Sequence, residues 1–165
     1  MKKKLTKILI MGIVLIMCLG IFVGCGDNKY NAELHYNAQA MMNAEYLEAN
    51  MTLGAYDGLV EDTSSPETRT HIIKNKDDFD FAFKEFPKEV DFSKKIVLIY
   101  FFTSSYPTSP YKLVKINLRD DVLSIHFKLN KSGSSSVPDA GLPKQTCIVV
   151  LMDKIDINAA VFKQV

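Results

Sequence analysis

Hydrophobic residues follow two patterns along this chain, continuous runs and strict alternation. Ile96 to Phe102 are seven apolar residues in a row, rich in β-branched and aromatic types. A run this short and this apolar is typical of a strand covered on both faces, and we expect it to be the central strand of a sheet. Gln145 to Met152 predicts another continuous strand.

The alternating pattern lies between these two runs. Residues 111–118 and 122–129 form the clearest predicted hairpin, joined by Arg119-Asp120-Asp121. Along the second strand, apolar residues alternate with Ser124, His126 and Lys128, which is the period of a sheet with one face in water. We therefore expect His126 to point outward.

Helical spacing appears twice. Asn75 is a predicted N-cap, Asp77 and Asp78 supply negative charge to the first turn, and Pro87 ends the helix. Its expected buried face is Phe79, Ala82, Phe83 and Phe86, with Phe81 outside that stripe. Between residues 32 and 50 a second stripe, Ala38, Met41, Met42 and Tyr46, predicts a helix whose face docks on the domain, and the same segment is also a candidate spacer.

Three weaker strands complete the expected fold. They are Thr52–Val60, bent at two glycines, Arg69–Lys74, and Ile155–Val165 after a turn at Asp153-Lys154. The fold class predicted from these elements is α+β: a mostly antiparallel β-sheet, curled or doubled into a sandwich, with one packed helix.

The first 25 residues have a different organisation. Four lysines precede an apolar run, Ile8 to Val23, and the chain turns polar directly after Cys25. This is the three-part pattern of an export signal peptide, with small Gly24 at the cut. An uncleaved membrane helix is the alternative, although Ile8–Gly24 is 17 residues, the short limit for a span.

The tetrapeptide Phe22-Val23-Gly24-Cys25 resembles a bacterial lipobox. The resemblance implies cleavage between Gly24 and Cys25, a lipid carrying palmitate on the Cys25 sulfur, and a lipoprotein held on the extracytoplasmic face of the cell membrane. The expected organisation is a signal peptide over residues 1–24, a lipidated N-terminus and helical spacer over 25–52, and one domain over 53–165.

Charge and cysteine content narrow the classes of function. Without the leader the chain has 16 basic and 19 acidic residues, so it is mildly acidic and has no footprint for nucleic acid. Only Cys25 and Cys147 remain, and lipidation would consume the first, which excludes a disulfide within the mature chain. Cys147 lies in an apolar run and is expected to be a small buried hydrophobe.

No catalytic or metal-binding motif is visible. His35, His71 and His126 lie in different elements without a second ligand at metal spacing. The serines belong to no nucleophile elbow, and the aspartate pairs lack the glycine and distal glutamate of a calcium loop. We therefore expect no metal, no cofactor and no enzymatic activity.

Two hydroxyl-rich loops are the candidate binding elements, because recognition is often placed on loops carried by a rigid sheet. They are Thr103–Pro110 and Asn130–Lys144. The residues expected to contact a partner are Tyr106, Pro107, Pro110, Tyr111, Ser134 and Pro138, although these residues equally suit a role in turning the chain.

The second half of the chain also carries a family resemblance. Val90–Lys95, the following strand, the loop closing on Tyr111, the hairpin, the Gly/Ser/Pro loop and Thr146–Met152 together resemble the PrcB C-terminal domain. That family takes its name from a lipoprotein subunit of a surface protease complex. The chain has Ser109-Pro110-Tyr111 where the family often has Gly-Gly-Tyr, and Thr146-Cys147-Ile148 where it has Thr-x-Pro.

Together these features predict a non-catalytic, membrane-anchored protein that binds or stabilises another exported protein, such as a protease, and that is a monomer outside any complex. A protease inhibitor presenting loops 103–110 and 130–144 is a second hypothesis. A third is a small-ligand binder or an enzyme whose site is assembled from residues distant in sequence.

Overall fold

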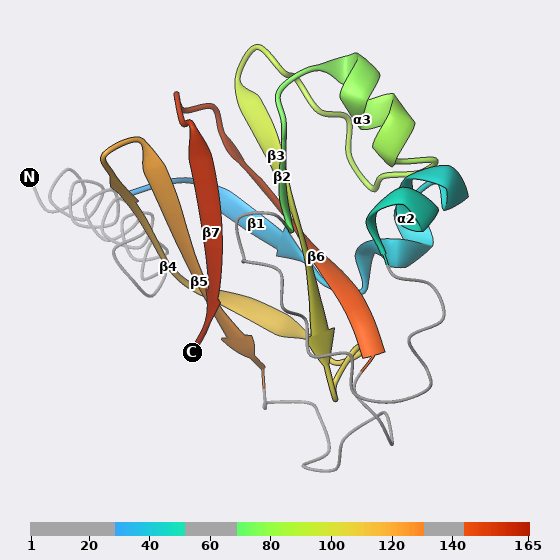
Figure 1. Cartoon of the computed structure of the whole chain (residues 1–165). Coiled ribbons are helices and arrows are strands. Elements are labelled where there is room, and N and C mark those ends of the chain that lie inside the picture. Colours follow the sequence, from blue (N-terminus) through green and yellow to red (C-terminus); the bar gives the residue numbers. More distant parts are fainter. Residues whose placement is uncertain (1–28, 52–68, 131–143) are drawn as a thin grey trace, which may run out of the picture.

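The computed structural model describes residues 29–51, 69–130 and 144–165, which form two β-sheets and a layer of short helices (Figure 1). The large sheet has the strand order β1-β6-β3-β2 and is antiparallel throughout. The small sheet has the order β4-β5-β7. The strands are β1 (Ala32–His35), β2 (Thr70–Ile73), β3 (Lys95–Ser104), β4 (Tyr111–Arg119), β5 (Val122–Leu129), β6 (Lys144–Asp153) and β7 (Ala159–Gln164).

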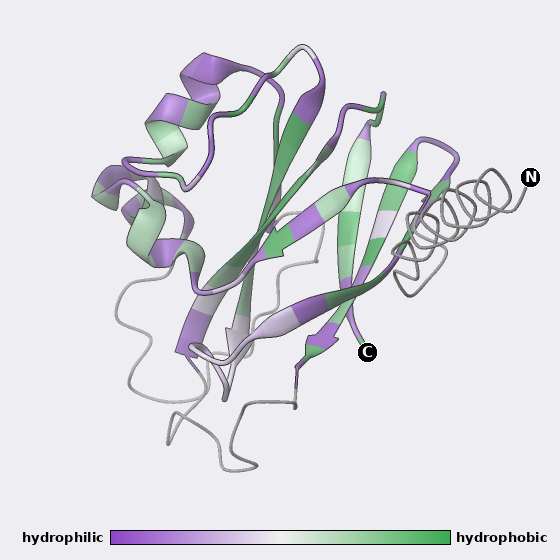
Figure 2. Ribbon diagram, turned by 180° about the vertical axis from the view of Figure 1, so that it is seen from behind, coloured by the Kyte–Doolittle hydropathy of each residue, from purple (hydrophilic) through white to green (hydrophobic). Residues whose placement is uncertain are grey.

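The predicted central strand is confirmed. β3 pairs with β6 over its full length, from Lys95 opposite Asp153 to Ser104 opposite Lys144. Residues 96–102 of β3 and 146–152 of β6 are all buried, because one face of the large sheet meets the small sheet and the other meets the helices. The apolar runs of the sequence thus correspond to strands that are covered on both faces. Figure 2 shows the hydropathy of the residues along the strands.

The predicted hairpin is also confirmed, as β4 and β5. Asp120 and Asp121 connect the strands with φ values of 50° and 61°, the left-handed pair that a two-residue hairpin turn requires. A bulge lies between Leu113 and Lys115. The last predicted strand is present as β7, which pairs with β5 in parallel, so the small sheet is mixed.

The core between the two sheets is rich in aromatic side chains. Tyr100 of β3 stacks on Phe162 of β7 with ring centroids 4.8 Å apart, and Phe127 of β5 contacts both rings edge-on. Such pairs add about 0.5–1.5 kcal/mol beyond the area they bury. Residues from all three strands of the small sheet therefore hold it on the large one.

The helix layer contains two short α-helices, one in each of the two segments with helical spacing. α2 (Ala44–Asn50), α3 (Lys76–Ala82) and the 3₁₀ turn η1 (Ala38–Met41) cover the other face of the large sheet. The predicted cap is confirmed, since the Asn75 side chain accepts a hydrogen bond from the Asp78 N–H.

α3 ends earlier than predicted, at Ala82 and not near Pro87. The side chain of Asn43 donates to the carbonyls of Asp80 and Phe81, and the Asn43 N–H donates to the Ala82 carbonyl. Carbonyls at the end of a helix lack partners within the helix, and here an N-terminal segment supplies them. Phe83 therefore leaves the helix in an extended conformation and stays buried.

The N-terminal segment belongs to the folded domain. Residues 32–35, which lie in the segment where we expected a helix, form β1 at the edge of the large sheet. Ala38, Met42 and Tyr46 are buried against the sheet, so the predicted stripe is a docking face. The folded unit therefore begins before residue 53, where we expected its boundary, and residues 32–50 are not a free spacer.

Two predicted elements lie outside the described residues, the strand Thr52–Val60 and the leader 1–24 with Cys25. Across the described ranges, no helix has the length and apolar character needed to cross a membrane. The coarse prediction of an α+β protein with mostly antiparallel sheets is confirmed.

Candidate functional site

The ends of the two candidate loops lie together at one end of the molecule. Ser104, where β3 ends, pairs with Lys144, where β6 begins. Tyr111, where β4 begins, pairs with Leu129 near the end of β5, and the N–H of Asn130 donates to the Pro110 carbonyl at 2.8 Å. We call residues 105–110, Asn130 and Lys144 the loop end.

The backbone of residues 105–110 is held by buried hydroxyl groups. Ser104 Oγ and Tyr111 Oη are 2.6 Å apart, and Ser104 Oγ also accepts from the Tyr106 N–H at 2.8 Å. From β6, Thr146 Oγ1 donates to the Pro107 carbonyl at 3.0 Å. A loop fixed in this way loses little conformational freedom on binding, which favours recognition.

Only part of the predicted contact set is at the surface. Tyr111 is buried between the sheets and Pro107 is buried as well, so the prediction that their side chains offer contact area is wrong. The pattern that places Leu113 inward places Tyr111 there too, since they are two residues apart on β4. Tyr106 and Pro110 are half-buried. Ser134 and Pro138 lie outside the described residues.

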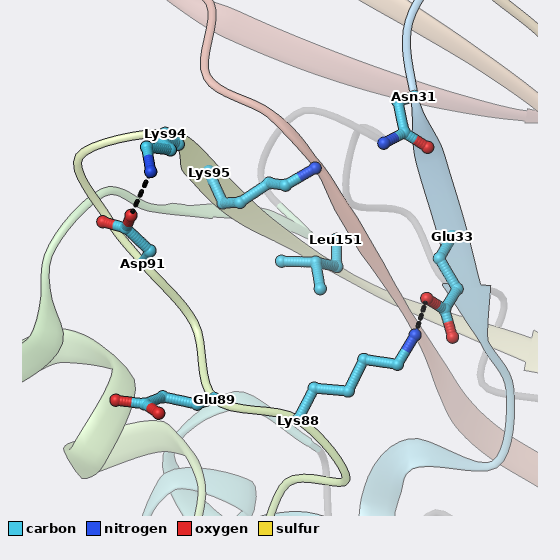
Figure 3. Close-up of a pocket in the computed structure, with 8 residues that line it drawn as sticks. All are labelled: Asn31, Glu33, Lys88, Glu89, Asp91, Lys94, Lys95 and Leu151. Atoms are coloured by element: carbon cyan, nitrogen blue, oxygen red, sulfur yellow. Dashed lines mark hydrogen bonds and ion pairs between the residues drawn. The ribbon is translucent and has the colours of Figure 1, made fainter.

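A surface hollow of about 430 Å³ lies beside β1 (Figure 3). Its lining residue Lys95 is at the end of β3 opposite to the loop end. Leu151 of β6 forms part of its lining, and the other lining residues are polar. Neither His71 nor His126 lines it. The lining residues are Asn31, Glu33, Lys88, Glu89, Asp91, Lys94, Lys95 and Leu151.

Two lysines of the hollow form ion pairs with two of its carboxyl groups. Lys88 binds Glu33, and Lys94 binds Asp91 at 3.4 Å (Figure 3). The hydrogen bond from Lys88 lowers the pKa of Glu33, and hydrogen bonds from Ser93 lower the pKa of Asp91. Both carboxyl groups are therefore ionised at neutral pH, and neither has the raised pKa of a general acid.

His71 is paired with a tyrosine under the helix layer. Tyr46 Oη of α2 lies 2.8 Å from His71 Nδ1 of β2. Burial raises the pKa of Tyr46 and lowers the pKa of His71. Both side chains are therefore uncharged at neutral pH, and the hydrogen bond between them links α2 to the sheet.

The other residues considered for chemistry lie apart. His35 packs edge-on against Phe86 and has a pKa lowered by burial, whereas His126 is on the outer face of the small sheet. Cys147 is fully buried against Met42, and burial raises the pKa of its thiol. Among the described residues, no three His, Cys, Asp or Glu side chains gather as a metal site.

The comparisons with known proteins found no match. No family model matches the chain, and neither a curated protein nor a solved structure matches it. The resemblance to the PrcB C-terminal domain therefore stays a prediction from the sequence.

The two residues that best define the loop end were not singled out by sequence. Ser104 and Thr146 are the buried polar residues of the large sheet. Each lies where an apolar run meets a loop, Ser104 just after one run and Thr146 just before another. A polar residue at that position needs a buried partner, and this was the available signal.

Proposed function

We propose that this chain is a lipid-anchored extracytoplasmic lipoprotein that uses the loop end to bind another exported protein, without catalysis of its own. The lipobox-like tetrapeptide ending at Cys25 supports the anchor. Two acyl chains hold a protein stably at a membrane, at about 0.8 kcal/mol per buried methylene.

The observation that carries the binding role is the organisation of the loop end. Two loops separated in sequence start and finish on paired strand ends. Buried hydroxyl groups fix the backbone of the first loop, residues 105–110. Half-buried Tyr106 supplies an aromatic ring, the type of side chain enriched at binding hot spots.

The finer description of the fold is part of the same proposal. We infer that the facing sheets form a sandwich of the PrcB C-terminal type, in which the domain's partner is a surface protease. The resemblance of residues 90–152 and the anchor support this partner class.

The anchor is tested by metabolic labelling with palmitate. The wild-type chain should carry label, and Cys25→Ala should carry none and retain its leader. A labelled Cys25→Ala protein would refute attachment at this sulfur.

The binding role is tested by crosslinking at the membrane, followed by purification and identification of partners. Tyr106→Ala should reduce recovery of a specific partner by about tenfold, the effect of a hot-spot residue contributing 1.4 kcal/mol or more. Phe81→Ala is the control, since Phe81 is an exposed aromatic residue on α3. Equal recovery with all three proteins would exclude the loop end.

Protease inhibition is a second candidate for the same surface, favoured by the rigid backbone of residues 105–110. An inhibitor would reduce the activity of an extracellular protease at a one-to-one molar ratio, and Tyr106→Ala would weaken that inhibition. Binding without inhibition would favour the stabilising role.

A further inference from the structure

The outer face of the small sheet carries positive charge only. Residues alternate along each strand, so those between the buried positions point away from the core. In β4, β5 and β7 the charged residues at these outward positions are all basic, and each is exposed. They are Lys112, Lys115, Arg119, Lys128 and Lys163.

The strand register brings these lysines into rows across the sheet. Lys115 of β4 lies opposite His126 of β5, which lies opposite Lys163 of β7. In the neighbouring row Lys112 lies directly opposite Lys128. Strands are about 4.8 Å apart, so the four lysines lie close together beside His126 on one face of the sheet. We call Lys112, Lys115, Lys128 and Lys163 the basic face.

The four lysines have no counter-charge on this surface. In the described part of the chain none of them forms an ion pair, whereas Lys76, Lys88, Lys94 and Lys95 each do. Like charges placed opposite each other weaken a sheet. A chain that is acidic after loss of its leader thus gathers unpaired positive charge on the one sheet face that no described element covers.

A membrane surface fits this face better than a protein does. Lysine is depleted in the centres of protein interfaces, whereas a flat array of lysines matches the plane of anionic headgroups. Each lysine close to such a surface adds to the electrostatic attraction. The hollow beside β1 is not lined by any of these four lysines.

The proposed anchor keeps the basic face close to lipid. The Asn31 carbonyl accepts a hydrogen bond from the Asp153 N–H, which fixes the start of the domain. Five residues separate Asn31 from Cys25, so the two positions are at most about 20 Å apart along the chain. β1, which follows Asn31, contacts β4 of the small sheet, so the tether leaves the domain next to this sheet.

We propose that the small sheet lies with its basic face on the anionic phospholipid surface to which the chain is anchored. This orientation points the helix layer away from the bilayer and leaves the loop end at the side, open to a partner. The inference rests on the proposed anchor, and it adds a defined orientation to it.

The experiment uses the lipidated protein, reconstituted in vesicles that contain a fluorescent headgroup acceptor. A dye is attached to Val161→Cys on the outer face of β7 or, in a control protein, to Glu48→Cys on α2. The native Cys147 is fully buried and Cys25 would be blocked by lipid. Energy transfer from each position then reports its distance from the bilayer.

With phosphatidylglycerol in the vesicles, position 161 should transfer more strongly than position 48. The difference should disappear in pure phosphatidylcholine and in about 1 M salt, where charges are screened beyond about 3 Å. Replacing the four lysines of the basic face by glutamine should abolish it as well. Replacing Lys76, Lys84, Lys94 and Lys154 removes the same charge elsewhere and should leave it unchanged.

Equal transfer from the two positions, or a difference that survives loss of the basic face, would overturn the orientation. If the control variant lost the difference as well, the effect would depend on net charge and not on the basic face, and the orientation would be overturned. The four lysines could instead crosslink to an acidic protein in cells while energy transfer in vesicles does not depend on phosphatidylglycerol. That result would overturn the proposal and identify the acidic protein as the partner of the basic face.

A separate experiment tests whether the chain has a lipid anchor at all. It measures sedimentation of the protein with phosphatidylcholine vesicles in high salt. A chain that stays in solution there has no lipid anchor. For such a chain, sedimentation with phosphatidylglycerol vesicles at low salt would still support the basic face, and at least about tenfold weaker binding is expected of the four-lysine variant. No sedimentation at low salt would refute it.

Discussion

The two sheets share one core but differ in what lies on their outer faces. The large sheet is covered by α2, α3 and η1, and its central strands β3 and β6 are buried on both sides. The small sheet has no described element on its outer face, where lysine, serine and histidine alternate with the core residues. One sheet therefore stabilises the protein from two sides, and the other offers a surface.

The comparison shows where the chain tolerates change. A residue pointing out of the small sheet contacts mainly solvent, so its chemistry is open to a function. Every residue in the middle of β3 packs against buried side chains on whichever face it points to, so packing restricts which residue types are tolerated there. The following tests compare matched positions on the two sheets.

The largest effect is expected from a lysine placed on each sheet. Val97→Lys buries a charge beneath the helix layer, where Val97 is fully buried, and should prevent stable folding because an unpaired buried charge costs several kcal/mol. Ser124→Lys on the outer face of β5 should change the free energy of unfolding by at most about 0.5 kcal/mol. Urea denaturation measures both, and similar values for the two variants would contradict the layer assignment.

A second test compares neighbours on β7. Phe162→Ala removes the ring stacked on Tyr100 and should destabilise the protein by about 3–5 kcal/mol. Val161→Ala, on the opposite face of the same strand, should cost much less, about 0.5 kcal/mol or below. If Val161 proved the more sensitive residue, the strand would face the other way.

The third test concerns the layer that distinguishes the large sheet. Asn75→Ala removes the cap of α3 and should lower the free energy of unfolding by about 1 kcal/mol. Lys84→Ala, an exposed position after the helix, is the control and should have little effect. Identical unfolding curves for wild type and Asn75→Ala would show that the cap is not needed for α3.

The smallest effect expected is a dependence on pH within the same layer. Burial holds the pKa of His71 and of His35 below the ordinary value of 6.5. The unfolded chain therefore binds protons at these histidines before the folded one does, so stability is complete above about pH 6.5 and falls as the pH decreases through that value. Melting temperatures at pH 7.5 and 5.5 should differ less in His71→Gln, and an unchanged difference would assign the effect to other groups.

Local patterns in the sequence predicted β3, β6, the hairpin and the Asn75 cap. In each case the residues that form the element also signal it, through a continuous run, an alternation, or a cap followed by aspartates. The loop end was predicted in part, because the sequence marks Ser/Pro-rich loops but not which of their residues turn inward. Tyr111 was misassigned because it was treated as part of the loop, whereas it is the first residue of β4 and faces inward like Leu113.

The remaining features depend on contacts between distant segments. Residues 32–35 carry no pattern distinguishing an edge strand from the start of a helix, and their pairing with β6 decides the outcome. α3 ends at Ala82 because Asn43 binds its carbonyls. The rows of the basic face depend on the parallel pairing of β7 with β5, and nothing near residues 159–164 indicates that partner.

The position of β7 has a consequence for the order in which the protein matures. This strand follows all the others in the chain, yet Phe162 fills the space between Tyr100 and Phe127. During synthesis the aromatic cluster therefore stays open until residues 159–164 have left the ribosome.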